Sequence, residues 1–390
     1  MVIAGTSWDG IWQSERHVAM HLAERQPVLW VDPQISHLSP MRNPTATRAL
    51  RGDRLRPVAP NIIRLTPVTV PGVTRPLLRD LGTRQARRAV RRAIEAIGAS
   101  VHTIIVSSLN DMLDVVPSAQ SVFYGTDDYA AGARLTGTDA RWLRRCTRRQ
   151  LRSADLVLAT SPVLARKWSS YRPDIEMVPN GCEAEHFATA DRASPPQDVH
   201  LEGPVAGFVG HISERIDLAM LEAVASSGVS LLLVGPRQAT FEIAKLDRLL
   251  ALPNVQWVGP KEFQELPSYL RVIDVGLTPY SQSDFNRASF PLKTLEYLAA
   301  GRAVVASDLP ANRWLDTPHV SIAGTPREFA ERTVSLLRAG RSEREASARR
   351  ALGARHSWAA RTEEIRRLLG LSGEAPASRR SPRSLQPQKS

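Results

Sequence analysis

Short apolar runs, rich in β-branched residues, alternate along the chain with longer stretches of helical spacing. This alternation predicts parallel sheets covered by helices, because strands buried on both faces are apolar at nearly every position. In the first half the predicted strands are residues 2–4, 28–31, 62–65, 103–107, 121–124 and 156–159. The predicted helices between them are residues 14–24, 75–97 and 140–152.

The same alternation restarts after residue 203, which predicts a second α/β domain. Its predicted strands are residues 205–209, 230–234, 255–258, 272–277 and 303–306, and its predicted helices are 218–225, 241–250, 265–270 and 292–300. The turn Pro179-Asn180-Gly181 marks the boundary, so we expect a first domain of residues 1–178. Residues 372–390 are rich in Ser, Pro, Arg and Gln and are expected to be a disordered tail.

Two Rossmann-like, doubly wound domains that face each other predict a ligand-binding cleft, lined by the carboxyl ends of both sheets. A bound dinucleotide would need G-x-G-x-x-G after the first strand of a domain. Residues 5–10 read GTSWDG and residues 207–211 read GFVGH, so neither domain has this pattern. The sequence thus argues against an NAD-dependent oxidoreductase and favours an enzyme of group transfer.

Residues 280–310 read YSQSDFNRASFPLKTLEYLAAGRAVVASDLP and contain the most informative helix. Pro291 suits its first turn, where free N–H groups and the helix dipole favour a diphosphate. Lys293 in that turn is explained better by an anionic ligand than by helix stability. Glu296 projects from the same face and could accept hydrogen bonds from ribose hydroxyls. The alternative for Lys293 and Glu296 is a solvated ion pair.

The run P-x-K-x-x-E-Y-L-A-A-G-x-x-V-V-A-S, at residues 291–307, resembles the nucleotide-sugar signature of GT-B glycosyltransferases. It is most similar to glycosyltransferase family 4 and its teichuronic-acid-type relatives. Other segments that resemble the family, in the expected order, are residues 157–165, 177–187, 208–217 and 356–358. The resemblance covers about residues 1–371. It implies that residues 356–371 cross back to the first domain, which leaves residues 179–355 as the second.

The resemblance implies a glycosyltransferase that moves a sugar from a nucleotide diphosphate sugar to a hydroxyl of a glycan or lipid-linked glycan. Such an enzyme would act in cell-envelope polysaccharide or glycolipid synthesis. The implied donor-binding residues are Gly210, His211, Arg215, Ser289, Phe290, Lys293 and Glu296. The implied acceptor-binding residues are Gly5, Trp8 and Asp9. A non-transferase nucleotide-sugar enzyme of the same fold is an alternative.

One acid of the family is missing. Retaining members carry Glu-x7-Glu, and with Glu296 as the second Glu the first falls at Ala288. This departure favours inversion of configuration. No D-x-D triplet occurs in the chain, so we expect neither a metal nor a further cofactor. Lys293, Arg215 and helix-end amides would neutralise the leaving diphosphate.

Two adjacent carboxylates, Asp127 and Asp128, follow the predicted strand at residues 121–124. Inversion needs a general base, and neighbouring acids can raise the pKa of one of them toward that use. We predict Asp127 or Asp128 as the catalytic base and prefer Asp127, which aligns with a family His. The alternative is that one of them caps the following turn. Asp9 is a third candidate, for which orientation of the acceptor is favoured over catalysis.

The chain has 51 basic and 39 acidic residues, which gives a net charge of +12, and residues 1–180 carry +10 of it with 25 basic and 15 acidic residues. Two predicted helices carry arginines at helical spacing. They are Arg84, Arg87, Arg88 and Arg91 in one helix, and Arg141, Arg144, Arg145 and Arg148 in the other. Basic stripes near apolar residues fit docking on an anionic membrane. The alternatives are solvated helix faces or a polyanion-binding protein.

Nucleic acid is not an expected partner, because aromatic residues are not interleaved with the arginines. The 43% of hydrophobic residues excludes a disordered chain, and two cysteines cannot form a disulfide scaffold. We find no apolar run of the ~20 residues that cross a bilayer. We therefore expect a cytoplasmic protein, peripheral to the inner face of the plasma membrane.

Overall fold

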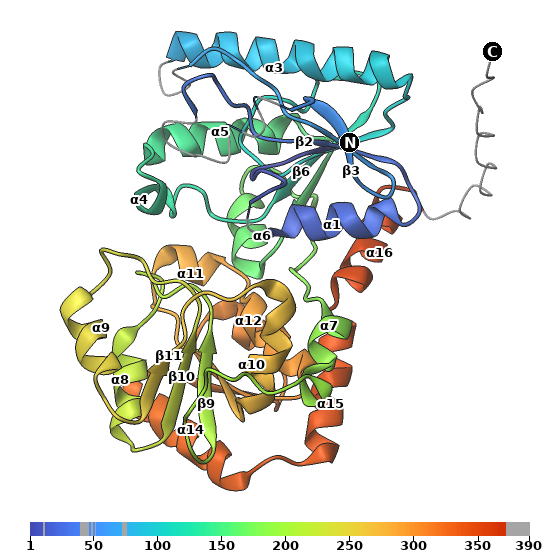
Figure 1. The fold of residues 1–390 in the computed structure, drawn as a ribbon. Helices are drawn as coiled ribbons and strands as arrows, with labels where there is room; N and C mark the ends of the chain where they lie inside the picture. Colours follow the sequence, from blue (N-terminus) through green and yellow to red (C-terminus); the bar gives the residue numbers. More distant parts are fainter. Residues whose placement is uncertain (11, 40–46, 48–49, 51, 72–75, 372–390) are drawn as a thin grey trace, which may run out of the picture.

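The computed structural model describes residues 1–10, 12–39, 47, 50, 52–71 and 76–371. It contains two α/β bodies, one above the other in Figure 1, and each is built around its own sheet. The fold class predicted from the sequence is therefore confirmed. The tail predicted at residues 372–390 lies outside the described residues.

The first sheet has eight strands in the order β3-β4-β2-β1-β5-β6-β7-β8, and only β3 and β4 are antiparallel. The order reverses between β1 and β5, which makes this the position where a doubly wound sheet binds ligands. The strands are β1 (Val2–Ile3), β2 (Val28–Val31), β3 (Leu55–Ala59), β4 (Ile62–Leu65), β5 (Thr103–Val106), β6 (Gln120–Gly125), β7 (Leu156–Ala159) and β8 (Ile175–Met177).

Helices cover both faces of this sheet, because successive strand residues point to opposite sides. Val2 and Ile105 pack against α1 and α16, whereas Ile3 and Val106 pack against α3, α5 and α6. The helices of this body are α1 (Ser14–Ala23), α3 (Pro76–Ile97), α4 (Ala133–Thr136), α5 (Ala140–Ser153), α6 (Pro162–Trp168) and α16 (Trp358–Leu368).

The second sheet has six parallel strands in the order β11-β10-β9-β12-β13-β14, with its switch point between β9 and β12. The strands are β9 (Val205–Val209), β10 (Ser230–Val234), β11 (Val255–Trp257), β12 (Val275–Thr278), β13 (Ala303–Ser307) and β14 (Val320–Ala323). The helices are α7 (Ala184–Ala188), η2 (Ala190–Arg192), α8 (Leu218–Ser226), α9 (Ile243–Leu250), η3 (Phe263–Glu265), α10 (Leu266–Val272), α11 (Asp284–Ala288), α12 (Leu292–Ala299), α13 (Pro310–Trp314), α14 (Pro326–Ala339) and α15 (Glu343–Arg355).

The chain passes between the two bodies twice, and the two passages are hydrogen-bonded to each other. The Cys182 N–H donates to His356 O at 3.0 Å, and the Trp358 N–H donates to Cys182 O at 2.9 Å. A Cβ on Gly181 would lie 2.6 Å from the Trp358 nitrogen, so this approach requires glycine. After the second passage α16 lies beside α1, in the lower right of the first body (Figure 1).

The elements that the sequence did not predict include β3, β8, β14, α4, α6, α7, α11, α13, α14 and α15. The sequence also predicted 272–277 as a strand, where α10 runs to Val272 and β12 starts at Val275. β3 is an edge strand of partly exposed residues, so its apolar pattern is weak. α15 has charged residues at nearly half of its positions and is held by packing against α12. These elements depend on tertiary contacts more than on local pattern.

A buried ion pair fixes the loop after β1 to the sheet. Arg64 and Asp32 are each at most 4% exposed, and Arg64 Nε donates to Asp32 Oδ2 at 2.6 Å. Asp32 also accepts from the Trp8 N–H, from the Trp30 ring N–H and from the Thr66 hydroxyl. All of these donors would lose their acceptor together if the carboxylate were removed.

We predict that Asp32→Ala lowers the free energy of unfolding by about 3–5 kcal/mol, because it leaves a buried guanidinium without its partner. Urea denaturation of the full chain measures this difference. Asp53→Ala removes an exposed carboxylate near the same sheet edge and should change stability by less than about 0.5 kcal/mol. Equal effects of the two substitutions would show that the Arg64 network does not hold the loop.

Candidate active site at the domain junction

The two switch points of the sheets face the same junction between the domains. The first is formed by the loops after β1 and β5, where a Cβ on Gly5 would lie 3.0 Å from Ser107 O. The second is formed by the loops after β9 and β12, which are joined by a bond from the Ser281 N–H to Arg215 O at 2.9 Å. Side chains from both meet at this junction.

Helix α12 is fixed over the second sheet by close packing. A Cβ on Gly276 would lie 2.3 Å from the Tyr297 ring, so the ring lies directly on β12. The Tyr297 hydroxyl accepts from the Val209 N–H at 2.8 Å and lies 3.3 Å from Gly207 O. This anchor sets the direction in which the first turn of α12 points.

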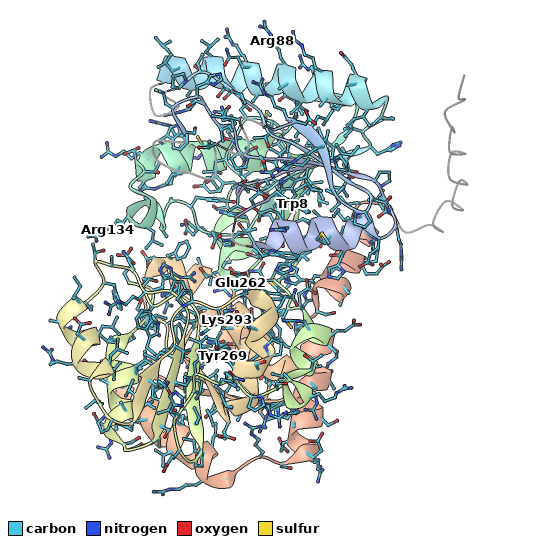
Figure 2. The ribbon with its side chains drawn as sticks, in the orientation of Figure 1. Trp8, Arg88, Arg134, Glu262, Tyr269 and Lys293 are labelled. Atoms are coloured by element: carbon cyan, nitrogen blue, oxygen red, sulfur yellow. The ribbon has the colours of Figure 1, made fainter. Side chains whose placement is uncertain are left out.

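Lys293 and Glu296 lie together on α12. Lys293 Nζ donates to Glu296 Oε2 at 2.7 Å, and their side chains are only 24% and 13% exposed. Both charges act on the hydroxyl of Tyr280, and so does the charge of Arg215. The ion pair is therefore largely shielded from solvent, and its two charges act on the same hydroxyl as the charge of Arg215. In Figure 2 Lys293 lies on the side of the second body that faces Trp8.

The start of α12 differs slightly from the prediction. Pro291 is the residue before the helix and has an extended ψ of 97°, so the helix begins at Leu292. Phe290 is 4% exposed and packs in the core beside Trp314, so its side chain is not available to a ligand. The Ser289 hydroxyl is 2.9 Å from Phe285 O, to which it donates. The Phe290 side chain is thus part of the core, and a role of Phe290 in donor binding stays a prediction.

The loop after β9 brings Arg215 to the junction. Its Nε donates to Asn286 Oδ1 at 3.0 Å, and its guanidinium lies over the rings of Tyr280 and Phe285. His211 is exposed and Gly210 is partly exposed in the same loop. A guanidinium positioned by an amide and two rings can meet an anion with little loss of side-chain entropy.

The two adjacent acids after β6 have different surroundings. Asp128 is 7% exposed, its Oδ2 lies 2.5 Å from Lys167 Nζ, and its Oδ1 accepts from the Ala131 N–H at 3.1 Å. Asp128 is therefore occupied as a turn cap and ion-pair partner, which was the alternative open for either acid. Asp127 has no ion pair within 4 Å among the described residues.

Asp127 lies where the two domains meet. Burial raises the pKa of Asp127, and the neighbouring charge of Asp128 adds to the rise, while Arg215 of the second domain opposes it. Direct contacts close the junction nearby. The Ser161 hydroxyl donates to Ala288 O at 2.5 Å, and a Cβ on Gly132 would lie 2.9 Å from the Phe285 ring.

The loop after β1 holds the predicted acceptor residues in different ways. Asp9 is 41% exposed at its side chain and pairs with Arg64 at 2.7 Å. Trp8 is 7% exposed, and its ring packs edge-on against Trp30 at 5.2 Å. The Trp8 ring is therefore largely buried, and acceptor binding by Trp8 stays a prediction. Gly5 lies in contact with Ser107 and with the carboxyl group of Glu15.

Glu15 is a residue of the junction that sequence reasoning did not assign. It is 4% exposed and accepts from the Thr6 hydroxyl at 3.1 Å. Burial raises the pKa of Glu15, and the charge of Asp127 raises it further. The sequence pattern could have predicted that Glu15 is buried, because Glu15 falls on the apolar face of α1 with Val18 and Leu22.

Among the described residues, no three His, Cys, Asp or Glu side chains are grouped as metal ligands. On the second-domain side of the junction, Lys293, Arg215 and the first N–H groups of α12 could hold a charged ligand. Within the described part of the chain, no helix combines the length and apolar character needed to span a membrane.

Comparisons with known proteins agree with this architecture. Residues 203–339 match the family model described as "Glycosyl transferases group 1". Sucrose-phosphate synthase from Thermosynechococcus elongatus superimposes with a TM-score of 0.71 at 16% identity, over 95% of this chain and 98% of that one. HepE of Anabaena, solved with UDP and glucose, superimposes with a TM-score of 0.64 at 14% identity, over 95% and 98% of the two chains.

Two curated relatives are similar in sequence. TuaH of Bacillus subtilis, named as a glycosyltransferase of teichuronic acid biosynthesis, is 33% identical over 238 residues, which are 58% of this chain and 59% of TuaH. A phosphatidyl-myo-inositol mannosyltransferase of Mycobacterium tuberculosis is 31% identical over 159 residues, which are 38% of this chain and 40% of that protein. The matches thus span about three fifths and two fifths of these relatives.

The chain has the GT-B fold, and residues 203–339 of its second domain match the model of the glycosyl transferases group 1 family. The family resemblance read from residues 291–307 is confirmed, since the matched region contains them.

We predict that Asp127→Asn makes the protein more stable at neutral pH. Because the pKa of Asp127 is raised in the fold, the folded protein holds the proton more tightly than the unfolded chain, and stability falls as the pH rises through this pKa. An amide does not ionise, so the advantage of the variant should grow from about pH 4 to about pH 8. Thermal unfolding across this range measures it.

Asp128→Asn is the matched control, because it removes the neighbouring carboxylate. It breaks the ion pair with Lys167 and weakens the turn cap, so it should destabilise the protein by about 1 kcal/mol. Destabilisation by Asp127→Asn of the same size would contradict the conclusion that burial raises the pKa of Asp127.

Proposed function

We propose that this protein transfers a sugar from a nucleotide diphosphate sugar to a hydroxyl group of a glycan or lipid-linked glycan. The observation that carries the proposal is the arrangement at the junction. Lys293, Glu296 and Arg215 of the second domain supply charges that act on the same group, the Tyr280 hydroxyl. The charge of Arg215 also acts across the junction on Asp127 of the first domain, where it opposes the rise in pKa caused by burial. A donor and a base are thereby brought to one place.

The second domain would bind the donor. Lys293, Arg215 and the N–H groups of the first turn of α12 present positive charge to a diphosphate. Glu296 would accept hydrogen bonds from the ribose hydroxyls, since an ionised carboxylate is only an acceptor. The Lys293–Glu296 bond at 2.7 Å holds both side chains in position before the ligand arrives.

Asp127 would act as the base in a single displacement. It takes the proton of the acceptor hydroxyl as that oxygen forms a bond to the anomeric carbon. The bond from this carbon to the diphosphate oxygen breaks, and the nucleoside diphosphate leaves with the electron pair. Lys293 and Arg215 stabilise the developing charge. A single displacement inverts the anomeric centre, and Ala288 supplies no acid beside the sugar.

The relatives support this class of reaction. TuaH and the mannosyltransferase are named for the synthesis of a cell-wall polysaccharide and a glycolipid, and HepE was solved with UDP and glucose. We extend to this chain a role in cell-envelope polysaccharide or glycolipid synthesis. We also propose that transfer proceeds without a metal ion, with side chains in place of the cation.

The first domain presents a basic face that suits an anionic membrane. α3 and α5 pack on the same face of the first sheet, and Arg79 of α3 lies over the Trp142 ring of α5 at 4.3 Å. Arg87 is half-buried and bonds Asp114 at 2.7 Å, so it serves the fold. The exposed arginines on these helices are Arg84, Arg88, Arg91, Arg92, Arg141, Arg144, Arg145, Arg148, Arg149 and Arg152.

Apolar side chains lie beside these arginines. Leu77 and Leu81 in the first turns of α3 are 84% and 43% exposed. In Figure 2 Arg88 points outward from α3, away from the second domain. We propose that this face binds the surface of an anionic membrane on the cytoplasmic side, which would bring the junction to a lipid-linked acceptor.

Nucleotide binding tests the donor site. We predict that one of UDP, GDP or dTDP raises the melting temperature of the full chain, and that Lys293→Gln weakens its affinity about 10- to 100-fold through loss of a charged hydrogen bond. Lys245→Gln is the control, because Lys245 and Glu242 form an exposed ion pair of the same spacing on another helix. Binding and transfer are measured with EDTA present, because transfer is proposed to need no metal ion.

An equal shift for wild type and Lys293→Gln would reject the site, and no shift with any of the three nucleotides would reject the transferase. A transferase is further distinguished from another nucleotide-sugar enzyme by Asp127→Asn, which should lower transfer by at least about 100-fold with nucleotide binding unchanged.

Membrane docking is tested with the quadruple variant R84Q/R88Q/R144Q/R145Q. Each basic residue near an anionic surface contributes about 1 kcal/mol, so the variant should lose about 1,000-fold in affinity for phosphatidylglycerol vesicles. The variant R327Q/R332Q/R338Q/R344Q removes the same charge from exposed positions of the second domain and should sediment like wild type. Equal loss in both variants, or tighter binding to an oligonucleotide at matched salt, would contradict membrane docking.

A further inference from the structure

Arg16 is a charged residue at the domain junction that no step of the proposed reaction uses. It lies in the first turn of α1, where a positive charge opposes the helix dipole. Helix stability therefore does not account for an arginine at this position. The neighbouring residue, Glu15, is turned inward and lies within the electrostatic range of Asp127.

Two indole rings hold the guanidinium of Arg16. Its central carbon is 4.0 Å from the centre of the Trp12 ring and 4.4 Å from that of Trp8. Its Nη1 donates to Trp8 O at 2.6 Å. These contacts fix the plane of the side chain before any ligand binds, so little entropy remains to be lost on binding.

The remaining hydrogen-bonding capacity of Arg16 is unused. Its Nε is buried and has no partner, and the side chain forms no ion pair within 4 Å in the described part of the chain. The nearest acid that acts on it electrostatically is Asp9, whose carboxylate is already 2.7 Å from Arg64. Arg64, by contrast, donates from all three of its nitrogens to Asp32, Asp9 and Ser7.

The clamp around Arg16 reaches the second domain. The Trp12 ring is parallel to that of Phe263 at 6.1 Å and is still 38% exposed. Figure 2 shows Trp8 at the lower edge of the first body, with Glu262 and Lys293 on the second body below it. Arg16 is therefore on the acceptor side of the junction that also contains the donor cluster and Asp127.

We propose that Arg16 binds an oxyanion carried by the acceptor, so that the acceptor is a phosphorylated or carboxylated glycan. This inference rests on the proposed function and names its substrate class. A planar guanidinium that is fixed in position and keeps N–H donors without a partner can pair with the oxygens of a phosphate or carboxylate. Asp127 then receives a hydroxyl whose distance from that anion is fixed by the fold.

Three probes with the same sugar ring separate the two sources of the anion. They are methyl glucoside 6-phosphate, methyl glucuronide and neutral methyl glucoside, titrated calorimetrically into the full chain with the preferred nucleotide present in excess to block the donor site. We expect wild type to bind one or both anionic probes at least tenfold more tightly than the neutral probe. The probe that binds more tightly identifies phosphate or carboxylate as the acceptor group.

Arg16→Gln should abolish this tenfold preference, and Arg16→Lys should restore part of it, because the charge returns without the paired donors. Arg25→Gln, just after the end of the same helix, is the control, since Arg25 is exposed and pairs with Glu363. With an anionic acceptor, Arg16→Gln should raise KM at least tenfold and leave kcat within about threefold. A role confined to holding Trp8 and Trp12 would lower kcat and affect charged and neutral probes alike.

The proposal is overturned if wild type binds the neutral probe as well as the anionic ones, or if Arg16→Gln keeps the preference. Nucleotide binding is measured in the same variants. If nucleotide fails to stabilise wild type, the proposed function fails, whereas unchanged nucleotide binding without anion preference rejects only the role of Arg16.

Discussion

The arrangement of this protein depends on two passages of the chain that hold the carboxyl edges of its two sheets toward each other. Two backbone hydrogen bonds tie the passages together, from Cys182 to His356 and from Trp358 to Cys182. Gly181 lies where the passages approach most closely. α1 of the first domain is fastened to them, since the Ser14 hydroxyl donates to Asn180 at 2.8 Å and His17 Nδ1 lies 2.6 Å from Glu183. Burial alone would raise the pKa of Glu183, but its hydrogen bonds with His17 and His21 hold that pKa at about 2. The side chains at the junction therefore meet with defined geometry.

The two sides of the junction are built on different physical terms. On the donor side, positive charge remains partly exposed and is oriented by rings and amides, as at Arg215. On the acceptor side, carboxyl groups are buried, and burial raises the pKa of both Glu15 and Asp127. A cationic site suits a diphosphate, whereas an acid with a raised pKa suits proton transfer. The opposition of these environments fits the two halves of the proposed group transfer.

The basic outer face is physically separate from this chemistry. α3 and α5 cover the side of the first sheet opposite α1 and α16, so their arginines do not enter the junction. A few of them serve the fold, as Arg87 does through Asp114, while the others remain exposed. Charge at this face acts over a Debye length on a surface, whereas charge at the junction acts through direct contacts on a single ligand.

The sequence by itself determined the two α/β domains, the position of α12 and the placement of Lys293 and Glu296 on one face of it, because apolar periodicity and helix-end chemistry are local properties. Only the tertiary structure decided which of two adjacent acids is engaged, since Lys167 reaches Asp128 from a helix 39 residues away in the chain. It also turned the rings of Trp8 and Phe290 into the core and left Arg16 clamped without a counter-ion. Those outcomes depend on which surfaces meet after folding, and contacts between distant segments are not encoded in the spacing of neighbouring residues.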